Sequence, residues 1–296
     1  MLHNLYLYIK AIRVWQWFKN LVVFTLPIGS GAMDFQILIK SLWAFLGLSF
    51  ISSSIYLIND IKDIDIDSQH YMKKNRPISS GLISIQSAKI FSCLLFLLSI
   101  FIFSSLNLTS LVLGCSYFLV GVLYTFKLKF TAYFDVLTIS SLFLIRVLIG
   151  GYSVEINPSS ILLLFIFFSS LSLAISKRIS IIKDDRLPVD SLYKNFLCNS
   201  FEINKTNNIF KATLILSFST YTFWVFFVNI TELFTFAAVF SILSIFFLGR
   251  SLLGIYKLTN ISELEDFLIS IYKNKQELSF IFFTILFSLL GIYFNL

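Results

Sequence analysis

The aspartates between residues 59 and 67 are the part of this sequence best suited to chemistry. The stretch reads NDIKDIDID, which places Asp60, Asp63 and Asp67 at intervals of three and four residues. On a helix these positions share one face, and Asn59 lies beside them, one turn before Asp63. Three carboxylates on one face repel one another unless a cation lies between them. Because Mg²⁺ commonly binds carboxylates together with substrate phosphates, the spacing predicts a diphosphate held through metal.

Two other interpretations of the acidic stretch are less favourable. A calcium-binding EF-hand loop would need Gly after the third acid and Glu at the twelfth position, but those places hold Ser68 and Lys74. A simple solvated acidic helix end would not alternate its acids with Ile61, Ile64 and Ile66.

A basic stretch follows, KKNRPISSG over residues 73–81. Arg76 precedes Pro77 near the turn at Gly81, and an Arg side chain is suited to bidentate phosphate contacts. We expect Arg76 to bind phosphate charges of the same substrate. For Lys73, a role as a positive anchor beside the membrane is the competing interpretation.

The segments that must position these residues are apolar. Of 296 residues, 57% are hydrophobic and 13% are charged, with a mean hydropathy of +0.85, whereas soluble domains carry about 25% charged residues. Continuous apolar runs of about 20 residues indicate membrane-spanning helices, not the alternating segments of a β-barrel. The expected fold is all-α and polytopic, with nine spans near residues 20–36, 38–58, 86–106, 108–126, 133–152, 160–176, 211–229, 233–249 and 279–295. The first is short and contains Pro27, Gly29 and Gly31, so we expect it to be kinked or tilted.

The distribution of positive charge predicts the orientation. With the N-terminus in the cytoplasm, of the 23 Lys and Arg residues only Lys40 would lie on the outer side and only Arg146 deep within a span, as the positive-inside rule requires. The net charge of +7 then reflects topology and needs no nucleic-acid partner. Near the N-terminus, basic residues beside Trp15 and Trp17 indicate a segment at the membrane surface, not a cleavable signal peptide.

Arg146 is expected to face polar groups. It lies about 13 residues into the fifth span, or roughly 20 Å along the helix, and an Arg at that depth needs a polar cavity or a partner. Asp135 is three turns earlier on nearly the same face. We expect Arg146 to contact a phosphate or a polar network in a cavity; a structural Arg–Asp or Arg–carbonyl network is the alternative.

Four segments together resemble a known family. They are YLINDIKDIDIDSQHYMKKNRPISSG over 56–81, RVWQWFKN over 13–20, the stretch 124–151 with YTFKLK, Asp135, Arg146 and Gly150-Gly151, and the pair Lys177-Arg178. They are similar to motifs of the UbiA superfamily of intramembrane prenyltransferases, and closest to its decaprenyl-phosphate phosphoribosyltransferase branch.

The resemblance implies one transferase domain over residues 1–296, with about nine transmembrane helices around a cavity open to the cytoplasm and to lipid. Such enzymes use a Mg²⁺-bound diphosphate as leaving group, and this branch joins 5-phosphoribosyl 1-diphosphate to a polyprenyl phosphate in cell-envelope biosynthesis, releasing pyrophosphate. By resemblance, metal and diphosphate would be held by Asn59, Asp60, Asp63 and Asp67. The substrate-binding set would be Lys19, Asn59, Lys73, Arg76, Tyr124, Lys129, Arg146, Lys177 and Arg178.

One departure from the superfamily pattern affects the choice of reaction. The second Asp-rich motif of ordinary prenyltransferases is missing after Lys177-Arg178, and Asp184 and Asp185 come later than the place expected for an acid. This disfavours transfer of a prenyl group to an aromatic acceptor and leaves open whether Asp184 or Asp185 replaces the motif. An ion transporter is an alternative from another class, disfavoured because the acids are at a helix end and not at the membrane midplane. The sequence leaves the oligomeric state and the polyprenyl length open.

Overall fold

The computed structural model describes residues 2–31, 34–68, 73–184, 192–229, 235–260, 270 and 272–294. These residues form helices and connecting turns, with no strand among them, so the all-α prediction is confirmed. The chain divides into two compact units. The first comprises Met1–Thr138, Ile145–Asn157 and Leu187–Asn195, and the second comprises Ile139–Leu144, Pro158–Arg186 and Phe196–Leu296.

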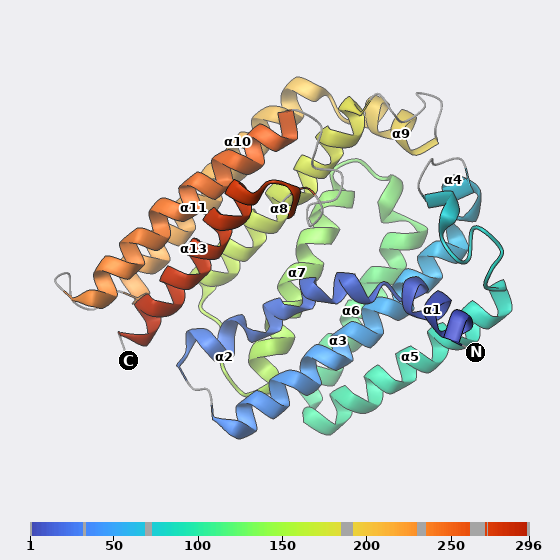
Figure 1. Ribbon diagram of the computed structural model, residues 1–296, viewed down its shortest axis with the longest axis horizontal. Helices are drawn as coiled ribbons and strands as arrows, with labels where there is room; N and C mark the ends of the chain where they lie inside the picture. The colour runs from blue at the N-terminus through green and yellow to red at the C-terminus, as the bar shows by residue number, and fades with distance from the viewer. Residues whose placement is uncertain are drawn as a thin grey trace. The chain divides into compact units, whose positions relative to one another are not determined.

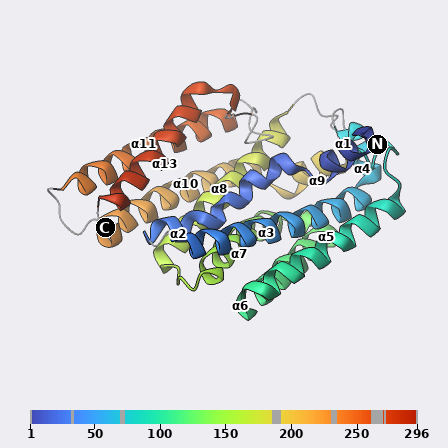
Figure 2. The same cartoon turned by 60° about the horizontal axis from the view of Figure 1, so that its bottom comes forward.

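The first unit begins with α1 (Leu2–Ala11), the 3₁₀ helix η1 (Val14–Phe24) and α2 (Thr25–Gly29). The helices α3 (Phe35–Lys62), α5 (Ile85–Leu106) and α6 (Leu108–Phe126) follow, with the short α4 (Ile64–Ser68) and η2 (Lys73–Asn75) between α3 and α5. The 3₁₀ turn η3 (Leu128–Phe130) leads into α7 (Phe134–Ser153), whose middle residues 139–144 group with the second unit. Figure 1 and Figure 2 both show α3 and α5 side by side.

Small side chains let α3 and α5 approach closely. Ser54 and Ser92 each donate a hydrogen bond to the other's carbonyl oxygen, at 2.9 and 3.0 Å, and both are buried. Further along the pair, Ser99 donates to the carbonyl of Gly47 at 2.9 Å. Serines of this kind bring helix backbones together in lipid and satisfy their own hydroxyl groups. The pairing fixes the end of α3, where the acidic stretch begins.

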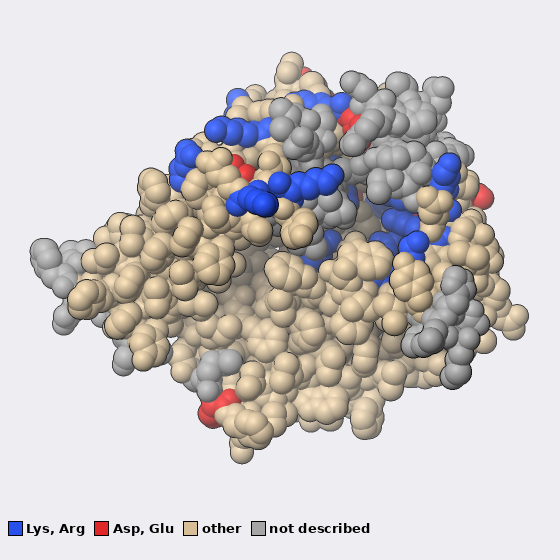
Figure 3. Space-filling model, viewed as in Figure 1, with Lys and Arg blue, Asp and Glu red and all other residues tan. Residues whose placement is uncertain are grey.

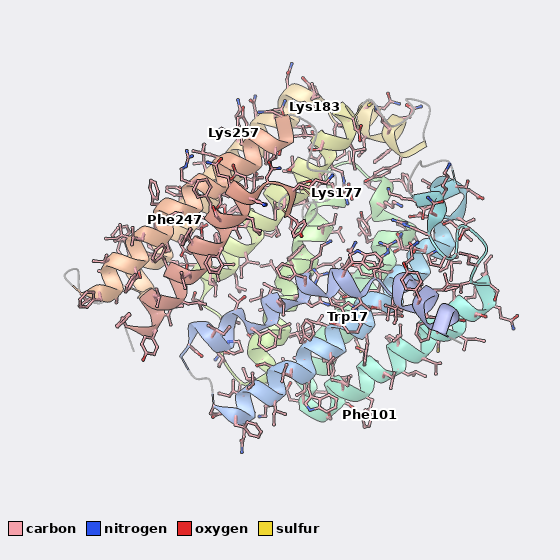
Figure 4. The ribbon with its side chains drawn as sticks, in the orientation of Figure 1. Trp17, Phe101, Lys177, Lys183, Phe247 and Lys257 are labelled. Atoms are coloured by element: carbon pink, nitrogen blue, oxygen red, sulfur yellow. The ribbon has the colours of Figure 1, made fainter. Side chains whose placement is uncertain are left out.

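The second unit contains α8 (Ser160–Lys183), α10 (Ile203–Trp224), the π-helical turn η4 (Val225–Asn229), α11 (Phe236–Asn260) and α13 (Lys275–Tyr293). Helix α8 pairs with α10 and α11 pairs with α13, while α9 (Leu192–Ser200) has residues in both units. Stacked rings of Phe240, Phe247, Phe283 and Phe287 join α11 to α13. Phe247 is labelled on α11 in Figure 4.

Eight helices of the described chain are long and apolar enough to cross a membrane. They are α3, α5, α6, α7, α8, α10 with the start of η4, α11 and α13, and they match eight of the nine predicted spans. Large apolar side chains lie on their outer surfaces; Phe101 of α5, labelled in Figure 4, is 71% exposed. The chain is thus an integral, multi-pass membrane protein.

The remaining predicted span, 20–36, takes a different form in the described residues. It is divided between the end of η1 and the five-residue α2, which contains Pro27 and ends at Gly29. A 3₁₀ helix of 11 residues is unusual, and close packing holds it in place. A Cβ on Gly150 of α7 would lie 2.1 Å from the carbonyl oxygen of Val23, so only glycine allows this backbone contact.

Replacing Gly150 with Ala should therefore displace η1 from α7. The added methyl group would overlap backbone that cannot rotate away, and overpacking of this kind costs about 1–3 kcal/mol or more. We expect a lower melting temperature, measured on detergent-purified protein. Gly29→Ala is the matched control, because a Cβ there meets nothing within 4 Å. Equal stability of the two variants would contradict the packing account.

Candidate functional site

The acidic stretch lies where α3 passes into α4. Asp60 is in the last turn of α3, Asp63 is its C-terminal cap residue, and Asp67 is in α4. Helical hydrogen bonds continue across the junction, from the Asp63 N–H to Asn59 and from the Asp67 N–H to Asp63, at 2.9 and 2.8 Å. All three aspartates are at most 4% exposed. The continued winding explains why residues spaced by three and four remain together.

Three cationic side chains meet the three carboxylates. Arg13, between α1 and η1, forms an ion pair with Asp60. Arg76, just after η2, places one nitrogen, Nη1, 3.1 Å from Oδ1 of Asp60 and 2.5 Å from Oδ2 of Asp67. Lys129 of η3 pairs with Oδ2 of Asp63. Each buried negative charge is therefore compensated, as burial of ions requires.

Asn59 supports the same array. Its amide nitrogen donates to Oδ2 of Asp63 at 2.9 Å, the oxygen that also accepts from Lys129. The amide thus orients the carboxylate of Asp63. We refer to Asn59, Asp60, Asp63, Asp67 and their cations Arg13, Arg76 and Lys129 as the acidic site.

Burial changes the acidity of Asp67. Loss of solvent raises the pKa of its carboxyl group, and the charge of Asp60 acts in the same direction, while the charge of Arg76 opposes both. Proximity of a second carboxylate in a buried place makes the charged form costly. The charged form of Asp67 is therefore stabilised by Arg76, which bridges Asp67 to Asp60.

The donor chemistry of the acidic site fits a divalent cation. Among the described residues no group of three or more His, Cys, Asp or Glu side chains is arranged as a preformed metal cage. Mg²⁺ does not require one, because it commonly takes one or two carboxylates and completes its shell with water and phosphate oxygens. Nη1 of Arg76 lies between Asp60 and Asp67, where a bridging positive charge is needed. The carboxylates and Asn59 are thus suited to hard-cation binding once an arginine contact is released.

Hydrogen bonds join the N-terminal segment to α3, the helix that carries Asp60 of the acidic site. Trp17 of η1, labelled in Figure 4, donates from its indole N–H to Ser53 of α3 at 3.0 Å. Ser53 in turn donates to the carbonyl of Ile12 at 2.9 Å. Lys19 donates to Gln16 at 3.0 Å within η1. These contacts place Arg13 and Lys19 on the segment that runs along α3 beside the acids.

Arg13 is a site residue that the motifs of the sequence do not predict. Besides its ion pair with Asp60, its guanidinium lies 4.9 Å from the centre of the Tyr56 ring. Tyr56 is one turn before Asp60 on α3, so the two contacts come from the same helix face. The available signal was the RVWQWFKN segment, in which a basic residue begins the stretch.

The sequence predicts that the acidic site binds a diphosphate, and on that prediction Arg13→Gln should weaken binding of the diphosphate without removing the acidic site, because Arg76 still compensates Asp60. A hydrogen bond to a charged group contributes about 1.5–3 kcal/mol, so we expect the KM for the diphosphate substrate to rise about tenfold or more. Arg13→Lys keeps the charge and should retain most of the affinity. The check is steady-state kinetics at varied concentration of that diphosphate. An unchanged KM in Arg13→Gln would show that Arg13 has only a structural role.

Arg146 belongs to a polar network of the first unit. Its Nε donates to Asn20 of η1 at 3.0 Å, and its Nη2 donates to the hydroxyl of Tyr117 on α6 at 2.5 Å. That hydroxyl is 3.1 Å from Ser52 of α3. Arg146 is 6% exposed, and its contacts join η1, α6 and α7. Arg146 thus has polar partners, as an Arg deep in a span requires, while its contact with a phosphate or with the polar network of a cavity stays a prediction.

Other predicted residues lie in the first unit at different places. Tyr124 of α6 donates to Oδ1 of Asp135 at 2.9 Å, which joins α6 to the first turn of α7. Asp135 is fully buried. Lys73 begins η2, three residues before Arg76. The structure therefore brings Lys129 and Arg76 to the carboxylates, while Tyr124 orients Asp135.

Lys177, Arg178 and Asp184 belong to the second unit, so their approach to the substrate stays a prediction. Arg178 and Asp184 are each 3% exposed, and Lys177 lies on α8 (Figure 4). Asp185 lies outside the described residues. Lys183 and Lys257 lie in the last turns of α8 and α11. Figure 3 shows large areas of the visible surface that carry no Lys or Arg side chain.

Comparisons with known proteins bear on this arrangement. A model of the UbiA prenyltransferase family matches residues 22–269. A decaprenyl-phosphate phosphoribosyltransferase of Mycolicibacterium smegmatis is 38% identical over 175 residues, 57% of this chain and 55% of the relative. A digeranylgeranylglyceryl phosphate synthase of Saccharolobus solfataricus is 29% identical over 173 residues, 57% of this chain and 59% of the relative. The chain thus aligns with between half and two thirds of the length of these relatives.

A solved structure is similar over nearly the whole chain. The structure of a UbiA homolog from Archaeoglobus fulgidus bound to GPP and Mg²⁺ matches with a TM-score of 0.62 at 15% identity, covering 98% of this chain and 99% of that one. At this identity the similarity concerns the fold.

Proposed function

The chain belongs to the UbiA prenyltransferase family and is a membrane-embedded transferase, and on that premise we propose that it transfers a 5-phosphoribosyl group from 5-phosphoribosyl 1-diphosphate to a polyprenyl phosphate. The reaction depends on Mg²⁺ and releases pyrophosphate. The acidic site is the observation that carries the proposal. Its buried carboxylates suit a metal-bound diphosphate, and its arginines suit the remaining phosphate charges. The similarity to the Mycolicibacterium phosphoribosyltransferase supports the choice of donor and acceptor.

In the proposed reaction the bond between C1 of the ribose and the diphosphate breaks, and a bond forms from C1 to an oxygen of the lipid phosphate. Pyrophosphate leaves with the bonding electrons. Mg²⁺, when bound, would neutralise the leaving diphosphate. Because the acceptor is already an anion, no strong general base is needed.

The residues of the acidic site have distinct roles in this proposal. Asn59, Asp60, Asp63 and Asp67 would hold the metal ion, and Lys129 positions the carboxylate of Asp63 through its ion pair. Arg76 and Arg13 exchange carboxylate contacts for phosphate oxygens when the donor binds. Further phosphate contacts would come from Lys19, Lys73, Lys177 and Arg178. Tyr124 and Arg146 would also contact the substrate. The two units act as one transferase domain in the cell membrane, with the N-terminus and the acidic site facing the cytoplasm.

Transfer of a prenyl group from a prenyl diphosphate is a second candidate, favoured by the similarity to the digeranylgeranylglyceryl phosphate synthase. An aromatic acceptor is the form of this reaction that the sequence disfavours, because the second Asp-rich motif is missing. The ion-transporter alternative does not fit a member of a transferase family.

Pyrophosphate release distinguishes the two reactions. Purified protein with Mg²⁺ is given 5-phosphoribosyl 1-diphosphate or geranylgeranyl diphosphate as donor. Each donor is combined with a polyprenyl phosphate, geranylgeranylglyceryl phosphate, 4-hydroxybenzoate or no acceptor. We expect release only with the ribosyl donor and polyprenyl phosphate together. Release with the prenyl donor and either of the other acceptors, and none with the ribosyl donor, would replace the proposal with prenyl transfer.

A further inference from the structure

A second feature of the first unit is a groove on the outer surface of α3, α5 and α6. Its volume is about 260 Å³. Ile58 and Ile61 of α3, Cys93 and Phe96 of α5 and Phe118 of α6 contribute its apolar walls. The rings of Phe96 and Phe118 are tilted against each other with centres 4.2 Å apart. The groove is therefore an apolar channel in a surface that faces lipid.

Its polar groups do not attract a ligand to the bottom of the groove. Ser54 and Ser92 lie in the floor, where their hydroxyl groups and carbonyl oxygens hydrogen-bond to each other across α3 and α5. Because these atoms are satisfied, the floor offers no polar group that needs a partner. A hydrocarbon chain can pack there without desolvating polar atoms.

Lys89 gives the groove one charged end. It is the charged residue among those that line the groove, and it is exposed near the start of α5. Lys89, Cys93 and Phe96 share a face of α5. The distance along the helix from Lys89 to Phe96 is seven residues, or about 10 Å. The lining thus presents a cation at the membrane surface and apolar side chains below it.

The groove is separate from the acidic site. Ile58 and Asp60 are two residues apart on α3, so they point about 200° apart around the helix. The side of α3 that carries Ile58 packs toward α5 and α6, whereas the side with Asp60 meets Arg13 and Arg76. An occupant of the groove is therefore not the substrate of the acidic site, and its binding does not depend on which reaction that site performs.

From this combination we infer that the groove binds an anionic phospholipid of the bilayer, with its phosphate paired to Lys89 and one acyl chain along Cys93 and Phe96. The negative head is selected because a zwitterionic head brings its own cation beside Lys89. Attraction of an anionic lipid by one Lys near the membrane surface corresponds to about a fivefold preference. The bound lipid would stabilise the packing of α3 against α5, and α3 carries Asp60 on its opposite face.

Cys93 makes the occupancy measurable in the full-length protein. A variant with Cys115→Ser and Cys198→Ser retains Cys93 as its thiol, and Cys93→Ser with Cys198→Ser retains Cys115. Both thiols are exposed, and Cys115 of α6 does not line the groove. Each protein is placed in nanodiscs of phosphatidylcholine, alone or with phosphatidylglycerol, and the rate of reaction with N-ethylmaleimide is measured.

We expect phosphatidylglycerol to slow modification of Cys93 about fivefold relative to phosphatidylcholine, and to leave Cys115 unchanged. Lys89→Gln should remove the difference, and Lys89→Arg should preserve it. Three results would overturn the inference. They are equal rates in the two lipids, protection that persists in Lys89→Gln, and protection by added polyprenyl phosphate with none by phosphatidylglycerol.

Discussion

Asp60→Asn should lower the rate of transfer at least about 100-fold while the protein still folds in the membrane. Asn preserves the shape of the side chain but removes the charge that would hold the metal ion in the proposed reaction, and loss of one electrostatic group at a reacting centre costs about 10²–10³-fold in rate. Asp60 also pairs with both Arg13 and Arg76, so the change removes the ion pair of Arg13 and leaves Arg76 paired with Asp67 alone. The measurement is the initial rate at which label passes from ribose-labelled 5-phosphoribosyl 1-diphosphate to polyprenyl phosphate. Size-exclusion chromatography tests whether the variant is folded.

Asp65→Asn is the matched control for this change. Asp65 lies in the same acidic stretch but is exposed, on α4. Its replacement should leave the rate within about twofold, since surface substitutions away from special features have small effects. If Asp60→Asn and Asp65→Asn retained similar rates, the assignment of Asp60 to the metal would be wrong.

The second large effect is expected for Arg76→Gln, which removes the nitrogen that bridges Asp60 and Asp67. Asp60 keeps Arg13, but the buried carboxylate of Asp67 loses the cation that joins it to Asp60, and breaking a buried pair in this way costs about 3–5 kcal/mol. We expect the melting temperature to fall by roughly 5–10 °C and transfer to be lost. Added Mg²⁺ should raise the melting temperature of this variant more than that of the wild type, because the ion supplies the missing charge.

Lys74→Gln tests whether the effect belongs to Arg76 or to the basic stretch as a whole. Lys74 is exposed and two residues away. It should change neither the melting temperature nor its response to Mg²⁺. A wild-type melting temperature in Arg76→Gln, or equal Mg²⁺ responses in the two variants, would contradict the bridging role.

Local spacing was enough to predict part of the fold and of the site. Apolar runs of about 20 residues gave eight helices that the structure contains, because hydrophobic length is a local property. The shared face of Asp60, Asp63 and Asp67 also followed from local spacing, since helical hydrogen bonds continue from α3 into α4.

The partners of those carboxylates could not be found in this way. Arg13 is 47 residues from Asp60, and Lys129 is 66 residues from Asp63. Only tertiary packing brings them together, and in a membrane protein basic residues beside a span already have an explanation in topology. The family resemblance predicts Lys129 as a site residue, whereas it predicts no such role for Arg13.

The segment 20–36 shows a second limit of local reasoning. Its apolar composition predicted a span, but its backbone packs on Gly150, and Asn20 accepts from Arg146, which is 126 residues away. Hydrophobic length does not report such contacts. The Gly150-Gly151 pair is present in the sequence motif, but only the structure shows that Gly150 contacts the backbone of Val23.

The most direct test of the account follows the ribose itself. Protein in nanodiscs is incubated with polyprenyl phosphate and 5-phosphoribosyl 1-diphosphate labelled in the ribose, and the lipid phase is extracted and counted. We predict label in the lipid phase that requires Mg²⁺, disappears with a chelator, and is absent with Asp60→Asn but present with Asp65→Asn. Label that stays in the aqueous phase with folded protein, or transfer that continues without a divalent cation, would contradict it.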